Sequence, residues 1–403
     1  MEFTLTQQVL LWTFGIAAVM GAVVNKTNFC TMGAISDLVN IGDTGRFRAW
    51  LFAIAIALLG VLALETFAGM SADSTLPPYR TANFAWLRYI VGGVIFGVGM
   101  TLGSGCANKT LVRIGGGNLK SVIVLLAGAT TAYFMTNPLY PGTDQTLYSL
   151  LFLQPVQATT IQLPTGQDLG SILAGIGGIA NVGTARLVVG IGVAAALLFV
   201  VFRSADFRKF DNILGGAIVG LAVVGGWFVT AGTLGQQWAS EVEWLDQQPI
   251  DVGAQSFTFV NPMGETLSLA LSPKMLLVSF GVAALAGVIV GSLVYAVVTR
   301  NFRLEWFKSP GDFFNHLIGG ALMGIGGVLA MGCTIGQGVT GVSTMAVGSL
   351  LAFGSIVLGS AVTMKVNYYR LVYEDEASFG KALVASLADM HLLPAGLRKL
   401  DAT

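Results

Sequence analysis

The chain has little charge, few cysteines and few histidines, and each shortage excludes a class of protein. Only 10% of its 403 residues are charged, whereas 54% are hydrophobic. Soluble domains carry about 25% charged residues, so this chain has too little polar surface to cover a water-soluble globule. Its three cysteines form no C-x-x-C pair, which argues against a thioredoxin-like redox motif. Because it has only two histidines besides, we expect no metal site.

Long apolar segments are the most abundant feature. Nine of them approach the length needed to cross about 30 Å of hydrocarbon. The expected fold class is therefore an all-α polytopic membrane protein with about nine transmembrane helices. No G-x-x-x-x-G-K-[ST] phosphate loop is present, and we expect no cofactor and no nucleic-acid partner. The predicted spans are about 8–27, 47–69, 85–104, 119–137, 184–203, 211–229, 274–298, 313–331 and 345–364.

The basic residues predict how the chain is oriented in a cell inner membrane. When the loops between nine spans are assigned alternately to two sides, one side receives most of the 21 lysines and arginines. Short loops rich in lysine and arginine stay cytoplasmic, so this distribution places the N-terminus outside and the C-terminus in the cytoplasm. The other side keeps only Arg80, Arg88, Arg186 and Lys274.

Two glycine-rich segments end in a lone cysteine at the same spacing. The first reads GGVIFGVGMTLGSGC and ends at Cys106, and the second reads GGALMGIGGVLAMGC and ends at Cys333. Because the spans that contain them cross in opposite directions, we predict an inverted repeat of four spans, one connector and four spans. The predicted divisions are a first repeat at 1–137, an extracytoplasmic loop and connector helix at 138–210, a second repeat at 211–370 with a further extracytoplasmic loop at 230–273, and a cytoplasmic tail at 371–403.

Each cysteine stands just beyond the predicted end of a span, in a turn rich in glycine, threonine or asparagine. The nearly uncharged stretches after Cys106 and Cys333 predict short re-entrant half-helices. Irregular backbone at membrane depth is tolerated only where it is buried in protein or lines a cavity. Helix N-termini carry unpaired N–H groups, so two such ends entering from opposite faces would make an anion site.

The residues that follow the cysteines complete the candidate site. Polar side chains here alternatively cap the short helices, and Lys109 alternatively marks the cytoplasmic boundary. A lone membrane cysteine is often a small apolar filler, but a neutral thiol also donates a weak S–H hydrogen bond that suits a soft, sulfur-bearing anion. We predict that substrate binding and translocation involve Cys30, Cys106, Cys333, Asn108, Lys109, Thr334 and Gln337.

Taken together, the cysteine segments resemble the YeeE/YedE family of thiosulfate transporters. The similar segments are NKTNFCTMGAISD, GMTLGSGCANKTLVRIGGGNLKS and GGVLAMGCTIGQGVTGVSTMA, and the resemblance runs from about residue 8 to 365. It implies a transporter rather than an enzyme, with thiosulfate passing along a transient chain of S–H contacts formed by Cys30, Cys106 and Cys333. It also implies a cytoplasmic sulfur-carrier protein that consumes the substrate. In place of the family's frequent basic or histidine-like residue near the third cysteine, this chain has Gln337.

Three alternatives remain open on the sequence. In the first, the transported substrate is a related sulfur anion or a selenium-containing compound. In the second, the chain is a membrane thiol–disulfide oxidoreductase that passes electrons through its three cysteines. In the third, it is a structural subunit of a larger complex and has no transport activity of its own.

Overall fold

The computed structural model describes residues 3–398 and 400, and within them the nine predicted spans are confirmed. Each span is an apolar helix long enough to cross a membrane, and the first and third include the short helix that follows. A helix satisfies every backbone N–H and C=O group within its own segment, which the hydrocarbon interior requires. The long helices are α1 (Leu5–Thr27), α3 (Gly45–Phe67), α4 (Trp86–Leu102), α6 (Leu119–Thr136), α10 (Val182–Phe202), α11 (Phe210–Ala231), α14 (Phe280–Val298), α15 (Pro310–Leu329) and α16 (Val347–Val372).

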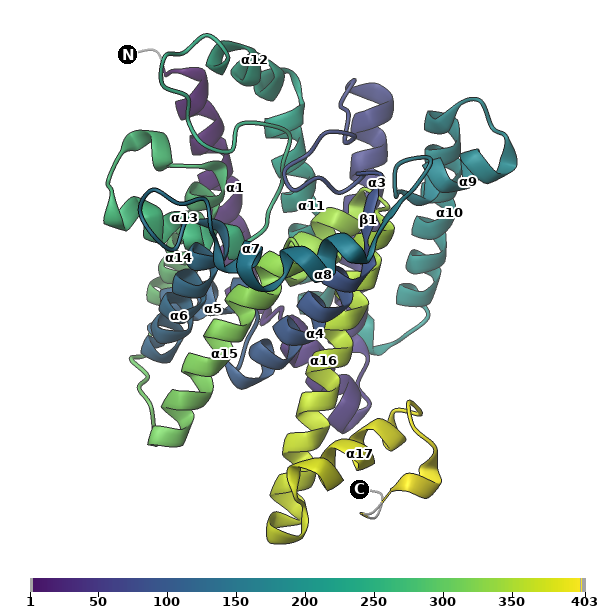
Figure 1. Ribbon diagram of the computed structural model, residues 1–403, viewed down its shortest axis with the longest axis vertical. Coiled ribbons are helices and arrows are strands. Elements are labelled where there is room, and N and C mark those ends of the chain that lie inside the picture. Colours follow the sequence, from purple (N-terminus) through teal and green to yellow (C-terminus); the bar gives the residue numbers. More distant parts are fainter. Residues whose placement is uncertain (1–2, 399, 401–403) are drawn as a thin grey trace.

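The two ends of the chain lie at opposite ends of the long axis of the molecule. Helix α1 begins at the top of Figure 1, whereas α17 (Phe379–Asp389) lies at the bottom. An odd number of crossings requires this arrangement. The assignment of these two ends to the outside and the cytoplasm stays a prediction.

Glycines allow the long helices to approach closely. A Cβ added at Gly99 would lie 2.7 Å from the Gly319 carbonyl oxygen, and one added at Gly326 would lie 2.7 Å from the Gly92 carbonyl oxygen. Helices α4 and α15 therefore pack antiparallel along their matched glycines. Gly97 makes the same kind of approach to α16, where an added Cβ would lie 2.3 Å from the Ile356 carbonyl oxygen. Small residues are the usual means of helix association in membranes, so the glycines of these spans serve packing.

Short helices follow four of the long ones, and three of them begin immediately after a cysteine. Cys30 and Cys106 are the N-cap residues of the first two, and Cys333 precedes a short helical stretch that becomes a π-helix. Gly232 is the N-cap of the fourth, as Cys30 is of the first. The inverted repeat itself stays a prediction. The short helices are α2 (Thr31–Ser36) with the π-helix η1 (Asp37–Ile41), α5 (Ala107–Gly115), α12 (Thr233–Val242) and the π-helix η4 (Gly336–Gly341).

The two long connections, between α6 and α10 and between α11 and α14, contain short elements: α7 (Leu147–Leu151), α8 (Leu153–Ala158), β2 (Thr160–Gln162) and α9 (Leu169–Gly177) in the first, and α12, α13 (Val260–Leu271) and η3 (Met275–Leu277) in the second. In Figure 1, α7 and α8 cross the middle of the view. Strand β2 pairs antiparallel with β1 (Asn83–Ala85), which lies between α3 and α4, and η2 (Asp206–Arg208) lies between α10 and α11. After the second connection, Ser279 accepts a hydrogen bond from the Val282 N–H and so starts α14 later than the apolar run begins.

The C-terminal tail is a small helical appendage on α16. Ala382 and Ala385 of α17 pack against Val366 and Tyr369, and the Tyr369 hydroxyl donates a 2.6 Å hydrogen bond to Asp389. The last residues of the predicted tail, 399 and 401–403, lie outside the described part of the chain. Its other elements are the 3-10 turns η5 (Glu374–Glu376) and η6 (Ala395–Leu397).

Candidate functional site

The three cysteine turns share one backbone geometry. The residue two positions before each cysteine has a positive φ, at 51° for Asn28, 59° for Ser104 and 58° for Met331. This left-handed conformation ends a helix abruptly, and the following N–H bonds back to the helix. The Gly105 and Gly332 N–H groups do so over 3.0 Å to Met100 and 2.8 Å to Gly327, respectively. As a result each cysteine starts a new helix directly after the old one stops.

Each cysteine sulfur lies against a backbone N–H three residues further along. The Gly33 N–H donates to the Cys30 sulfur over 3.5 Å, and the Gly336 N–H donates to the Cys333 sulfur over 3.4 Å. The Lys109 amide lies near the Cys106 sulfur in the equivalent place, but Cys106 makes no capping hydrogen bond. The sequence led us to expect free helix ends facing an anion, but at Cys30 and Cys333 the sulfur takes up one amide of the helix that follows. A sulfur that accepts such a bond can still donate its own S–H hydrogen.

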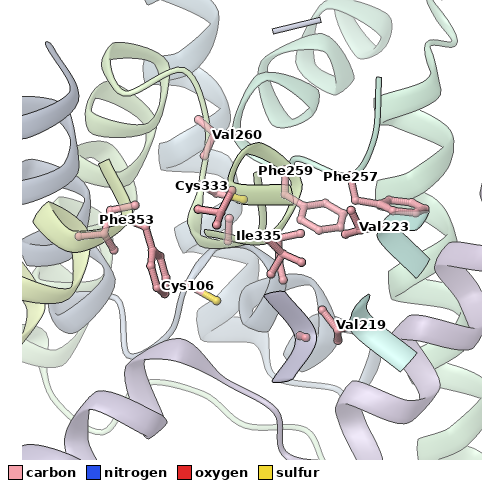
Figure 2. Packing of buried hydrophobic residues seen from close by; sticks show 14 of the residues in the cluster. Cys106, Val219, Val223, Phe257, Phe259, Val260, Cys333, Ile335 and Phe353 are labelled. Atoms are coloured by element: carbon pink, nitrogen blue, oxygen red, sulfur yellow. The ribbon is translucent and has the colours of Figure 1, made fainter. Parts of the chain in front are cut away.

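The structure brings the three cysteines into one buried cluster. The thiols of Cys30 and Cys106 are near enough to act on each other, and Cys106 also lies near the Thr334 hydroxyl next to Cys333. Their exposed fractions are 6% for Cys30, 1% for Cys106 and 0% for Cys333. Figure 2 shows Cys106, Cys333 and Ile335 among the side chains of one buried cluster. We call this cluster the waist.

Polar atoms around the waist lack hydrogen-bond partners. Within the described part of the chain, the buried atoms without a hydrogen-bond partner here are Thr31 Oγ1, Asn108 Oδ1, Thr258 Oγ1, Thr334 Oγ1 and Gln337 Oε1. The other end of the Gln337 amide donates 2.7 Å to the Ala330 carbonyl, so this side chain also caps the end of α15. A buried polar atom without a partner costs about 1–3 kcal/mol, so these atoms suit a path that water or a polar substrate visits.

Lys109 supplies positive charge beside the waist. Its side chain is 8% exposed, and its Nζ donates a 2.5 Å hydrogen bond to Asn28 Oδ1 in the turn before Cys30. Its charge acts on both Cys30 and Cys106. The sequence singled out Lys109, but its partner Asn28 is far away in the chain and was not expected.

Two cavities with charged lining residues lie near opposite ends of α4 and α15. One, the Glu265 vestibule, has a volume of about 310 Å³ and reaches Arg88 near the start of α4. The other, the Lys109 vestibule, has a volume of about 420 Å³ and reaches Ser104 just beyond the end of α4. The Glu265 vestibule is lined by Arg88, Asp251, Thr258, Asn261, Glu265 and Met331 among others. The Lys109 vestibule is lined by Ser104, Lys109, Arg113, Lys120, Arg303 and Asp312 among others.

The segment after Cys333 is held in place by side chains from distant parts of the chain. The Tyr79 hydroxyl donates 2.9 Å to the Gly336 carbonyl, and Arg80 donates 3.1 Å to the Thr344 carbonyl. The Thr340 hydroxyl donates 2.7 Å to the Phe257 carbonyl. These bonds satisfy backbone groups of an irregular segment that runs through the protein interior, so its position is fixed.

Two threonines at the waist were not among the site residues predicted from the sequence. Thr258 interacts with the Cys333 thiol and also lines the Glu265 vestibule. Thr31 directly follows Cys30, just as Thr334 follows Cys333. The repeated Cys-Thr pair was therefore a signal for Thr31. Thr258 lies in the segment QSFTFVNPMGETLSL, which also resembles the family, but nothing in that segment marks this side chain as a neighbour of Cys333.

These features define a class of protein. The chain is a multi-pass helical membrane protein whose cysteine turns form a buried waist between two polar vestibules, the arrangement expected of a transporter. Residues 26–362 match the family described as Sulphur transport, and the chain belongs to that family. The resemblance found in the three cysteine segments is confirmed.

Two curated relatives agree with this family. The "Thiosulfate transporter TsuA" of Escherichia coli (strain K12) is 25% identical over 365 residues, covering 88% of this chain and 93% of the relative. The protein of the same name from Spirochaeta thermophila (strain ATCC 700085 / DSM 6578 / Z-1203) is 25% identical over 360 residues, covering 87% and 97%, respectively. Both are named as transporters, and this chain is likewise a transport protein rather than an enzyme.

Proposed function

We propose that this protein takes up thiosulfate or a closely related small sulfur anion across the inner membrane, by a relay of weak S–H contacts. The observation that carries the proposal is the convergence of three buried thiols between two polar vestibules. The names of the two relatives support the choice of thiosulfate. The proposed direction runs from the Glu265 vestibule past Cys333, Cys106 and Cys30 to the Lys109 vestibule.

The chemistry of a thiol suits this task. The terminal sulfur of thiosulfate is large and polarisable, and a neutral thiol donates a weak hydrogen bond to it. The Thr334 hydroxyl beside Cys106 and the Thr258 hydroxyl beside Cys333 add donors along the same line. Because each contact is weak, the anion is not held at one position. An arginine in place of these thiols would form a stronger, charge-assisted bond and retain the anion.

The Lys109 vestibule would deliver the anion to the cytoplasm. Four basic side chains line it, against two acidic ones, so it attracts anions. A cytoplasmic sulfur-carrier protein that consumes the substrate there would keep the inside concentration low and the net flux inward. In this proposal the N-terminus lies outside and the C-terminus in the cytoplasm.

Removing the Cys333 thiol by the substitution Cys333→Ala is expected to lower thiosulfate uptake at least tenfold. The measurement is uptake of radiolabelled thiosulfate into proteoliposomes, with protein-free vesicles as the background. Cys333→Ser is the matched variant, because a serine hydroxyl still caps the following helix but lacks the soft sulfur donor. We expect Cys333→Ser to fold like the wild type and transport poorly.

Comparison of Cys333→Ala with Cys333→Ser distinguishes the loss of the thiol donor from the loss of the helix cap. Full uptake by Cys333→Ala, in protein that is monodisperse in detergent, would contradict the relay. Full uptake by Cys333→Ser would show that a hydroxyl serves as well as a thiol. Absence of uptake by the wild type would redirect the test to other sulfur or selenium anions.

One observation favours a second candidate, a membrane thiol–disulfide oxidoreductase. The Cys30 and Cys106 thiols are near enough to interact. In that function they would join as a disulfide, and the two protons and two electrons released would pass to a membrane quinone. Mass spectrometry of alkylated protein tests this directly: a Cys30–Cys106 disulfide that forms on addition of quinone supports the oxidoreductase. Three free thiols throughout transport exclude it.

A further inference from the structure

The Glu265 vestibule is lined by two carboxyl groups, an unexpected feature at the entrance of an anion path. Asp251 and Glu265 come from different segments, the polar loop before α13 and α13 itself, and they are near enough for each carboxyl to act on the other. Two ionised carboxylates repel each other, so such a pair holds a proton between them. Thr258, which lies beside Cys333, lines the same cavity, so the cavity that holds the pair reaches the surroundings of the first thiol of the relay.

Both members of the pair are fixed in position. The Gln255 side chain donates to the Asp251 carbonyl, and the neighbouring Ile250 N–H donates 3.2 Å to the Leu276 carbonyl. Ser279 donates to the Glu265 carboxylate while it accepts a 3.1 Å bond from the Val282 N–H. These bonds hold the backbone of Asp251 in the loop and tie the Glu265 carboxylate to the start of α14.

The charged groups that face this cavity are few. They are Asp251, Glu265 and Arg88, whose guanidinium donates 2.8 Å to the Leu329 carbonyl at the end of α15. The other elements packed around the cavity contribute uncharged lining residues, such as Pro262, Phe280 and Val328. With one proton on the acid pair, the vestibule is neutral. Without it, the vestibule carries one net negative charge.

We propose that the Asp251–Glu265 pair is a proton-binding site that controls entry of the anion into the Glu265 vestibule. The proposal rests on the proposed function. While the pair holds its proton, Arg88 balances the remaining carboxylate and an anion enters. Loss of the proton adds a negative charge directly beside the path. A dianion entering past that extra charge is repelled twice as strongly as a monoanion.

The titration falls in the physiological range. Burial raises the pKa of Glu265 to about 8, and the charge of Asp251 adds to the effect. Burial also raises the pKa of Asp251 above its ordinary value. Glu265 is therefore mostly protonated at neutral pH and ionises as the medium becomes alkaline, so uptake is expected to fall with rising outside pH.

The test is the pH profile of thiosulfate uptake into proteoliposomes. Between about pH 7 and pH 9.5 we expect wild-type uptake to fall about five- to tenfold, from the Coulomb repulsion of one added charge. Cysteine thiols titrate in the same range, so a variant is needed to assign the pH dependence to Glu265. The side chain in Glu265→Gln cannot ionise, and uptake by this variant should fall by less than about twofold over the same pH interval. Glu243→Gln, which changes an acid outside the vestibule, is the matched control and should keep the wild-type profile. An unchanged profile in Glu265→Gln would overturn the proposal.

A second measurement is independent of transport. Infrared titration of the purified protein follows the protonated carboxyl band, which should disappear with a midpoint near pH 8 in the wild type and be missing in Glu265→Gln. Asp251→Asn should move the midpoint down, since the charge of Asp251 raises the pKa of Glu265. If the band titrates but no thiosulfate enters at any pH, the proposed function fails and the proton site stands. If no band titrates near pH 8, the proton site fails whatever the uptake.

Discussion

Replacing Gly291 by leucine is expected to prevent the protein from folding. Gly291 lies on α14 where that helix meets α1, and a Cβ added there would lie 1.8 Å from the Ala18 carbonyl oxygen. Two neighbouring glycines at the same contact between α1 and α14 are nearly as close to the backbone of the facing helix. An added Cβ would lie 2.2 Å from its nearest oxygen at Gly21 and 2.6 Å from it at Gly287. Because the obstructing atoms belong to the backbone, a larger side chain can be accommodated only if the two helices move apart.

The expected loss is more than about 3 kcal/mol, since the substitution combines overpacking with loss of the whole close contact. The measurement is the yield of monodisperse protein in detergent, followed by its thermal unfolding. Gly15→Leu is the matched control on α1, where an added Cβ meets nothing within 4 Å, and it should behave as the wild type. A Gly291→Leu protein with wild-type yield and unfolding temperature would show that the close contact between α1 and α14 is not needed for folding.

Most of the fold could be predicted from the sequence, because its signals are local. A span needs only an apolar run of the right length, and the nine runs suffice to find the nine helices. The glycines of GGVIFGVGMTLGSGC and GGALMGIGGVLAMGC lie at the α4–α15 contact, although the sequence did not predict that these two spans pack against each other. Short helices after Cys106 and Cys333 were expected, since the turn residues and the lack of charge are visible in the sequence.

The site was harder to predict, because it depends on contacts between distant segments. How far each short helix enters the protein cannot be told from local residues, so the proximity of Cys30 and Cys106 was not predicted. Thr258 was missed for the same reason, because it reaches Cys333 from a loop 75 residues earlier in the chain. The acid pair was missed as well, since Asp251 and Glu265 are each ordinary residues of a polar connection.

Replacing Lys109 by glutamine is expected to lower thiosulfate uptake about 10- to 100-fold without unfolding the protein. Lys109 is the buried cation beside Cys30 and Cys106, and it lines the vestibule through which we propose the anion leaves. A dianion entering the waist loses most of its hydration, and a cation a few ångströms away offsets part of that loss. Each tenfold change in uptake corresponds to about 1.4 kcal/mol of this stabilisation.

The choice of glutamine keeps the structure while removing the charge. A glutamine amide still donates a hydrogen bond, so the partner oxygen of Asn28 is not left unsatisfied. Lys120→Gln is the matched control, because Lys120 lines the same vestibule but is paired with Asp312 over 2.7 Å. Its charge is already balanced, and we expect its uptake to stay within about twofold of the wild type.

Salt dependence provides a readout that a merely structural role would not change. An exposed charge is screened at physiological ionic strength, where the Debye length is about 8 Å, whereas a buried charge is screened much less. The defect of Lys109→Gln should therefore persist when uptake is measured at high salt, and it should appear chiefly as weaker thiosulfate binding in calorimetry of the purified protein. Wild-type binding and uptake in folded Lys109→Gln would remove Lys109 from the path and leave the thiols and hydroxyls of the waist to carry the anion alone.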